Sequence, residues 1–162
     1  MDSSSVWYGA VVRGDRNIVQ IGRNSCIKDR AVINTVSELP TGLPANVVIG
    51  TNVSVGPAAV VTSSVLEDQV QIGAGAIVSE GCVVGKNSIV AAGAMLPAGT
   101  LIPANQFWAG HPATYQRDVS EEEVQALEAA LALVKDVARE HAAEFLDHGF
   151  AYVEAEKAGI KP

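Results

Sequence analysis

Aliphatic residues recur at every sixth position through most of the chain, apart from one step of five and one interruption between Ile33 and Ile49. The series closes at Trp108, and its earlier members are Ile21, Ile27, Ile33, Ile49, Val55, Val61, Leu66, Ile72, Val78, Val84, Val90, Leu96 and Ile102. A small or acidic residue tends to follow each of these anchors, and another compact residue comes four places after it. This spacing is typical of hexapeptide repeats, so we predict a parallel β-helix with three short strands per coil. A sandwich of alternating strands would show period two and irregular turns instead.

The repeat is interrupted once, by residues 36–46 (VSELPTGLPAN), where Pro40, Gly42 and Pro44 prevent regular strand structure. We expect a loop that projects from a corner of the prism. Loops on rigid scaffolds often carry functional sites, although a tolerated insertion explains the segment equally well.

The pattern changes after residue 116, where helical spacing replaces the six-residue period. Residues 117–149 are predicted to form one long helix, with Ser120 and Glu123 as its capping box and Gly149 near its end. Its apolar stripe should lie against the prism and consists of Val124, Leu127, Leu131, Val134, Ala138, His141 and Phe145. We therefore divide the chain into a β-helix over 1–116, a helix over 117–149 and a tail over 150–162.

Composition and charge exclude several classes of protein. Hydrophobic residues make up 48% and charged residues 18%, which excludes disorder and coiled coil. Aromatic residues are only 5%, so the core is expected to consist of Val, Ile, Leu and Ala. The net charge is −7, and residues 117–162 contribute −6 of it through 5 basic and 11 acidic side chains. Such an acidic chain is not expected to bind nucleic acid. No apolar run approaches the roughly 20 residues of a membrane span, and the first residues do not resemble a signal or transit peptide.

The two cysteines do not form a disulfide framework or a zinc knuckle. Cys82 falls at a compact inward position and is expected to be a small core residue. Cys26 falls at a turn position and is expected to be exposed.

Val6 is already in register as a strand, so the first coil begins with almost no cap. We expect either preceding sequence or a partner to cover it.

Four segments together resemble the γ-class carbonic anhydrases. They are Val6–Asp15 (VWYGAVVRGD), Cys26–Asp29 (CIKD), Val55–Pro57 (VGP) and Trp108–Ala113 (WAGHPA), and the resemblance is collinear from about Ser5 to Glu123. It implies a left-handed β-helix that forms a trimer. It also implies zinc between subunits, held by three histidines, two from one chain and one from its neighbour, with an open position where bound water becomes hydroxide.

The resemblance places other residues at all three ligand positions. The family's histidines fall at Asn34, Pro57 and Thr62, and two further polar site residues are replaced by Cys26 and Lys28. Proline has no side-chain donor, and amide or hydroxyl groups are poor zinc ligands. The three histidines of the chain, His111, His141 and His148, lie far along the sequence and are expected at surface or cap positions. We expect no catalytic residue, no metal site and no cofactor in this chain.

The assembly residues of the family are retained at Arg13, Asp15 and Asp29. In the family, the arginine equivalent to Arg13 and the acid equivalent to Asp29 pair across the subunit interface. An arginine–carboxylate pair sets the geometry and register of an interface. The resemblance therefore implies that Arg13, Asp15 and Asp29 belong to a trimer interface.

A chain without ligands but with an intact interface resembles the carbonic-anhydrase-like subunits of mitochondrial respiratory complex I. This resemblance implies a heterotrimer with two other γ-class chains on the matrix side of the membrane arm, at the mitochondrial inner membrane. Zinc would then be possible only between the two other chains. Two alternatives stay open. One is a free-standing hexapeptide-repeat homotrimer that binds a small ligand or bicarbonate, and the other is a hexapeptide acyltransferase, although residues 1–110 contain no histidine to serve as its base.

Overall fold

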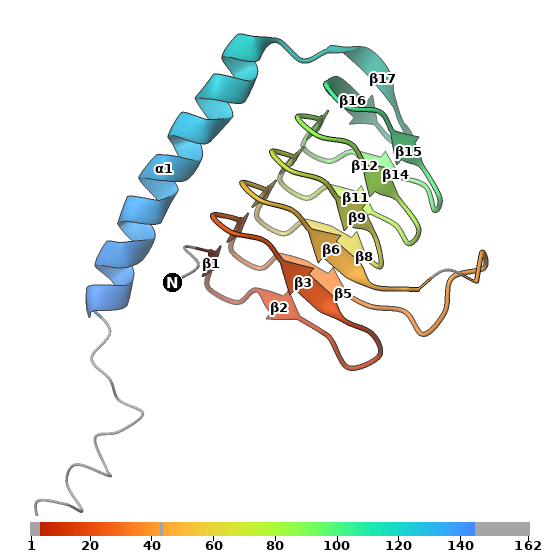
Figure 1. Ribbon diagram of the computed structural model, residues 1–162, viewed down its shortest axis with the longest axis horizontal. Helices are drawn as coiled ribbons and strands as arrows, with labels where there is room; N and C mark the ends of the chain where they lie inside the picture. The colour runs from red at the N-terminus through yellow and green to blue at the C-terminus, as the bar shows by residue number, and fades with distance from the viewer. Residues whose placement is uncertain (1–3, 43, 145–162) are drawn as a thin grey trace, which may run out of the picture.

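In the part of the chain that the structure describes, three sheets form the three faces of a prism, and one helix runs beside one of them (Figure 1). A computed structural model of the chain describes residues 4–42 and 44–144. Successive strands occupy successive faces, so every third strand pairs in parallel with the strand one coil earlier. This topology is the parallel β-helix that the six-residue period predicted, followed by the predicted C-terminal helix.

The strands are short, and each face collects one strand per coil. Face A contains β1 (Ser5–Val6), β4 (Cys26–Ile27), β7 (Ser54–Val55), β10 (Gln71–Ile72), β13 (Ile89–Val90), β16 (Gln106–Gly110) and β17 (Ala113–Asp118). Face B contains β2 (Val11–Val12), β5 (Val32–Asn34), β8 (Val60–Thr62), β11 (Ile77–Val78) and β14 (Met95–Leu96). Face C contains β3 (Val19–Ile21), β6 (Val47–Ile49), β9 (Val65–Leu66), β12 (Val83–Val84) and β15 (Leu101–Ile102).

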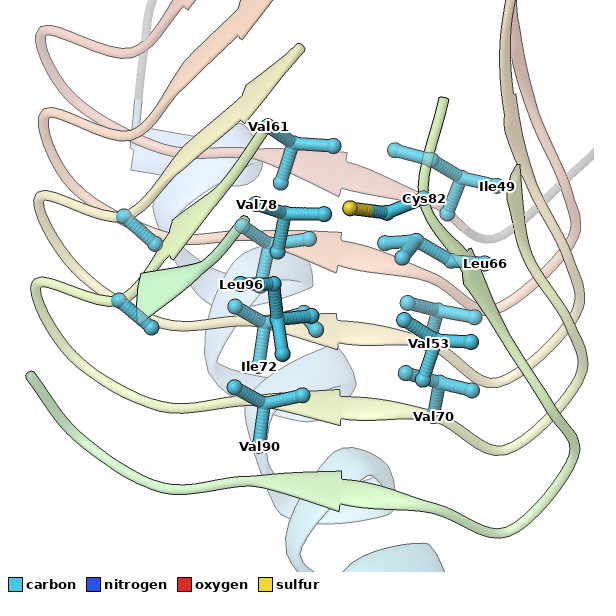
Figure 2. Packing of buried hydrophobic residues seen from close by; sticks show 14 of the residues in the cluster. Ile49, Val53, Val61, Leu66, Val70, Ile72, Val78, Cys82, Val90 and Leu96 are labelled. Atoms are coloured by element: carbon cyan, nitrogen blue, oxygen red, sulfur yellow. The ribbon is translucent and has the colours of Figure 1, made fainter. Parts of the chain in front are cut away.

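The predicted anchors form the core of the prism. Each one from Ile27 to Ile102 is at most 3% exposed, while Ile21 and Trp108 pack against the same cluster from its two ends. Figure 2 shows side chains from different coils stacked above one another inside the prism, with Cys82 among them. Burial raises the pKa of the Cys82 thiol, in agreement with its predicted role as a small core residue.

The small residue after an anchor is required by the neighbouring coil. At Gly56, a Cβ atom would lie 2.6 Å from the backbone nitrogen of Ala74, which belongs to the next coil. No side chain fits at that distance, because the backbone atoms on both sides are held by the sheet. The close spacing of coils at the corner, rather than the turn alone, therefore explains the glycine in the repeat.

One buried serine closes the neck of the inserted loop. Ser63 accepts a hydrogen bond from the backbone N–H of Val36 at 2.8 Å and donates one to the carbonyl oxygen of Ala45 at 2.7 Å. These contacts join the two ends of the predicted loop over 36–46 to the next coil. Figure 1 shows the loop projecting beyond the prism.

The end of the prism differs from the prediction. Residues 113–118 form β17, which turns back and pairs antiparallel with β16. Residues 117 and 118, which the predicted division gave to the helix, therefore belong to a strand, and α1 (Glu121–Glu144) begins directly after the predicted N-cap Ser120. The strand covers the open edge that the last coil would otherwise expose. Residues 145–149, which the prediction included in the helix, and the tail over 150–162 lie outside the described residues.

The helix begins at the predicted capping box. The backbone N–H of Glu123 donates to Ser120 Oγ at 3.3 Å, and the backbone N–H of Ser120 donates to Glu123 Oε2 at 3.0 Å. Arg117 in β17 holds the same carboxylate with two hydrogen bonds of 2.7 and 2.6 Å. Hydrogen bonds from Arg117 first, and then from Ser120, lower the pKa of Glu123 from 4.5 to about 2. The guanidinium of Arg117 also lies 4.7 Å from the centre of the Phe107 ring.

The helix covers face A and corrects the prediction for Cys26. Leu127 and Leu131 of α1 are buried in a cluster with Cys26 and the partly buried Trp7 and Val134. Cys26 lies in β4 and is 2% exposed, so it is neither at a turn nor at the surface. Both expectations for Cys26 were wrong, because the residue belongs to a strand and α1 covers that side of the prism. No helix within the described residues has the length and apolarity needed to cross a bilayer.

Candidate subunit interface

Face B presents an apolar column that no other part of residues 4–42 and 44–144 covers fully. From β5 to β14 the inward residues, such as Ile33 and Val61, are fully buried, so the residues that precede them in the strands point outward. Val11 and Ile77 are 45% and 41% exposed. The whole column, here called the face-B ladder, consists of Val11, Val32, Val60, Ile77 and Met95, which lie in register. A continuous aliphatic strip of this kind is typical of a protein–protein interface.

A polar column follows the ladder at the other end of the same strands. Asn34 and Thr62 are register partners in β5 and β8. Arg13 lies on the preceding coil, where its backbone N–H donates to the carbonyl oxygen of Ile33 at 2.8 Å. This bond places Arg13 beside Asn34. These three side chains lie next to the corner between faces B and C, here called the B–C corner.

The third predicted ligand position lies at the opposite end of face B. Pro57 is exposed in the turn that joins β7 to β8, at the corner between faces A and B, here called the A–B corner. The structure thus brings Asn34 and Thr62 together and places Pro57 away from them. Pro57 and this pair therefore do not form one site within a single chain.

The donor groups at these positions do not fit zinc. Asn34 offers an amide, Thr62 a hydroxyl and Pro57 no side-chain donor, whereas zinc sites use imidazole, thiolate and carboxylate ligands. In residues 4–42 and 44–144, no three histidine, cysteine or acidic side chains are grouped closely enough to hold a metal ion. Cys26 packs under α1 on face A, so its thiol points away from face B.

Arg13 has a carboxylate partner within the single chain, but that partner is Asp15. Their side chains form an ion pair of 2.9 Å and are 53% and 51% exposed. The hydrogen bond from Arg13 lowers the pKa of Asp15 below its usual value. Asp29 is exposed at the A–B corner, while Arg13 lies at the B–C end of face B. The two residues therefore lie at opposite ends of one face, and their predicted pairing requires two chains.

A contact between the first coil and the helix was not foreseen. Tyr8 Oη lies 2.9 Å from Nδ1 of His141, and the Trp7 ring stands edge-on to the His141 ring with 5.4 Å between their centres. These residues are more than 130 positions apart, so no local spacing indicated the contact. His111 is exposed where β16 turns into β17, and His148 lies outside the described residues.

A parallel β-helix with a six-residue period defines a hexapeptide-repeat protein. A family model described as Bacterial transferase hexapeptide (six repeats) matches residues 63–98. Among solved structures, a hexapeptide transferase family protein from Anaplasma phagocytophilum has a TM-score of 0.78 and 30% sequence identity, covering 85% of this chain and 78% of that one.

Two relatives define the family more narrowly. The chain is 46% identical over 135 residues to the Probable carbonic anhydrase of Methanocaldococcus jannaschii, a match that covers 83% of this chain and 81% of that protein. It is 41% identical over 156 residues to Gamma carbonic anhydrase-like 1, mitochondrial, of Arabidopsis thaliana, covering 96% of this chain and 62% of that protein. The chain belongs to the γ-class carbonic anhydrase family, which includes carbonic-anhydrase-like proteins. It spans between 51% and 62% of the length of the Arabidopsis relatives that it matches.

Proposed function

We propose that this chain is a non-catalytic subunit of a γ-class heterotrimer on the matrix side of the membrane arm of mitochondrial complex I. The observation that carries the proposal is the pair Asn34 and Thr62, which lie side by side where the family is expected to hold zinc but offer an amide and a hydroxyl. Without a metal, no group on face B can lower the pKa of a bound water, so the hydration chemistry of the family has no nucleophile.

The geometry of the trimer limits what the assembly can catalyse. Each zinc site of the family takes ligands from two neighbouring chains, so a chain without ligands removes both sites to which it contributes. At most one site remains in the trimer, between the two sister chains. The proposed contribution of this chain is therefore structural, through Arg13, Asp15 and Asp29 at the interfaces with its sisters.

The cellular setting rests on the relatives and on the family resemblance. Curated relatives from Arabidopsis are named mitochondrial, and two of them are named carbonic anhydrase-like. We propose the same compartment for this chain, peripheral to the inner membrane. The face-B ladder supports assembly, because exposed aliphatic strips of this length are costly in a chain that works alone.

Purification of the solubilised native complex, followed by native mass spectrometry, tests the proposal. We expect this chain together with two other γ-class chains and with membrane-arm subunits of complex I. If the trimer retains any zinc, at least one sister chain should have histidines at the positions equivalent to Asn34, Pro57 and Thr62. Recovery solely as a free homotrimer would overturn the proposal and favour the ligand-binding alternative. Acyl transfer from acyl-coenzyme A by the purified chain would favour the acyltransferase alternative.

A further inference from the structure

The basic side chains of the prism gather at its first two coils. Residues 4–35 contain five basic and two acidic side chains, whereas residues 36–118 contain two basic and five acidic ones. The charges of the prism therefore balance overall but are separated along its axis. A separation of this kind orients a protein toward a charged surface.

Two exposed arginines flank the face-C strand of the first coil. Arg16 lies in the turn before β3, at the B–C corner, and Arg23 lies in the turn after β3, at the corner between faces C and A, here called the C–A corner. The guanidinium of Arg16 donates to Ser37 Oγ at 2.7 Å, and this neutral partner leaves its charge in place. The acidic neighbour of Arg16 along the chain, Asp15, forms its ion pair with Arg13.

The helix α1 adds two cations on the same side of the molecule. Lys135 Nζ donates to Asn24 Oδ1 at 3.3 Å, which places this side of α1 beside the C–A corner. Arg139 follows one turn later on the same side of the helix and is 68% exposed. Its pair with Asp136, at 3.6 Å, is equally exposed and therefore weak. Arg16, Arg23, Lys135 and Arg139 are here called the basic patch, and Figure 1 shows this end of α1 beside the first coil.

Apolar side chains are exposed beside the basic patch. Ile18 comes two residues after Arg16 and is 68% exposed, and Val12 in the same coil is 41% exposed. Peripheral proteins bind anionic lipid surfaces with this combination, because the cations approach the phosphate groups while apolar side chains enter the headgroup region. A nucleic acid would use the charges and leave Ile18 in water.

We propose that the basic patch, together with Ile18, binds an anionic phospholipid surface. The inference extends the proposed function, on which it rests for the identity of the membrane. The predicted pairing of Arg13 with Asp29 of a neighbour joins residues of the first two coils, so neighbouring chains lie parallel and their first coils face the same side. The acidic first turn of α1 lies at the other end of the prism and points away from the lipid phosphates.

Co-sedimentation of the purified full chain with phospholipid vesicles tests the charges. We expect binding to vesicles made of equal parts phosphatidylcholine and phosphatidylglycerol, little binding to phosphatidylcholine alone, and weaker binding as salt screens the attraction. Arg16→Gln should weaken binding by roughly fivefold, the effect of one basic residue near such a surface. Lys86→Gln is the matched control and should leave binding unchanged, because it removes the same charge from an exposed position at the C–A corner three coils away.

A second matched pair tests the apolar contact. Ile18 and Leu101 are equally exposed, but Leu101 lies in β15 at the other end of the prism. Ile18→Ser should weaken vesicle binding, whereas Leu101→Ser should leave it unchanged, and circular dichroism verifies that each variant retains the fold.

The vesicle assay and the purification of the native complex separate this inference from the proposed function. Absence of binding to the anionic vesicles, or equal losses in the Arg16 and Lys86 variants, would overturn the inference even if the chain co-purifies with complex I. Binding that requires Arg16 and Ile18 in a chain that does not co-purify with complex I would support the inference and overturn the proposed function.

Discussion

Asn34 and Thr62 are register partners in adjacent parallel strands, and both follow a fully buried anchor, Ile33 or Val61. Their side chains therefore leave the prism on the same face, one coil apart. This arrangement suits two ligands of one metal ion, but an amide and a hydroxyl are poor ligands for zinc. The proposed function therefore depends on the side chains at these two positions and not on a change in the backbone of face B.

Restoring histidines should restore metal binding. The wild-type chain should contain far less than one zinc per subunit by elemental analysis and should not accelerate CO2 hydration. The triple variant Asn34→His, Pro57→His, Thr62→His should approach one zinc per subunit in the trimer, because three imidazoles then converge from two chains.

A double variant on face C provides the control for this experiment. Val48 and Val65 are also register partners, so Val48→His with Val65→His supplies two adjacent imidazoles without a third from a neighbour. Its zinc content should stay well below that of the triple variant. Stoichiometric zinc in the wild-type protein would contradict the assignment of Asn34, Pro57 and Thr62.

Reversing the charge of Arg13 should dissociate the trimer. Arg13→Glu places a carboxylate against Asp29 of the neighbouring subunit and beside Asp15 of its own chain. Loss of one partner of a partly buried pair costs roughly 2–5 kcal/mol per contact, which is enough to dissociate a trimer at micromolar concentration. Arg139→Glu, on an exposed part of α1, should leave the sedimentation coefficient unchanged. Survival of the trimer in the Arg13 variant would remove this residue from the interface.

The ion pair of Arg117 in β17 with Glu123 in α1, here called the clasp, should weaken in acid. The pKa of Glu123 is about 2 in the folded chain and 4.5 ordinarily, so the stabilisation is complete above pH 4.5 and is lost as the pH falls toward 2. Thermal unfolding followed at 222 nm should show this loss, and Glu123→Gln should reduce the dependence on pH in that range. Glu122→Gln removes a neighbouring charge and leaves the pair of Arg117 with Glu123 in place. An identical pH profile for both variants would argue against the clasp.

The position of a leucine in the repeat should decide the effect of its truncation. Leu66 is fully buried in the prism, whereas Leu101 points outward on the same face and is 68% exposed. Leu66→Ala should lower the free energy of unfolding by about 2–5 kcal/mol, because it leaves a cavity between coils. Leu101→Ala should change it by less than about 0.5 kcal/mol. Chemical denaturation of both variants makes the comparison; equal losses would contradict the inward register of the anchors.

Cys26 and His141 make contacts between the prism and α1 that the sequence did not predict. The sequence indicated an exposed turn position for Cys26, whereas the residue lies in β4 and the docking of Leu127 and Leu131 buries its thiol. His141 was placed correctly on the helix side that meets the prism, yet its contact with Tyr8 depends on the direction and height of α1. The strand β17 was missed because its residues, Ala113–Asp118, carry no anchor of the repeat and are specified by pairing with β16.

The sequence by itself determined the parallel β-helix, the inward anchors, the projecting loop and the capping box of the helix. Each of these depends on a short-range rule that repeats along the chain or is satisfied within four residues. Tertiary structure alone decided that α1 covers face A, and that Asn34 and Thr62 are neighbours while Pro57 lies at the opposite end of face B. These relationships join residues from different coils or from the helix and the prism. They depend on the stacking of coils and on the docking of the helix, which no local pattern encodes.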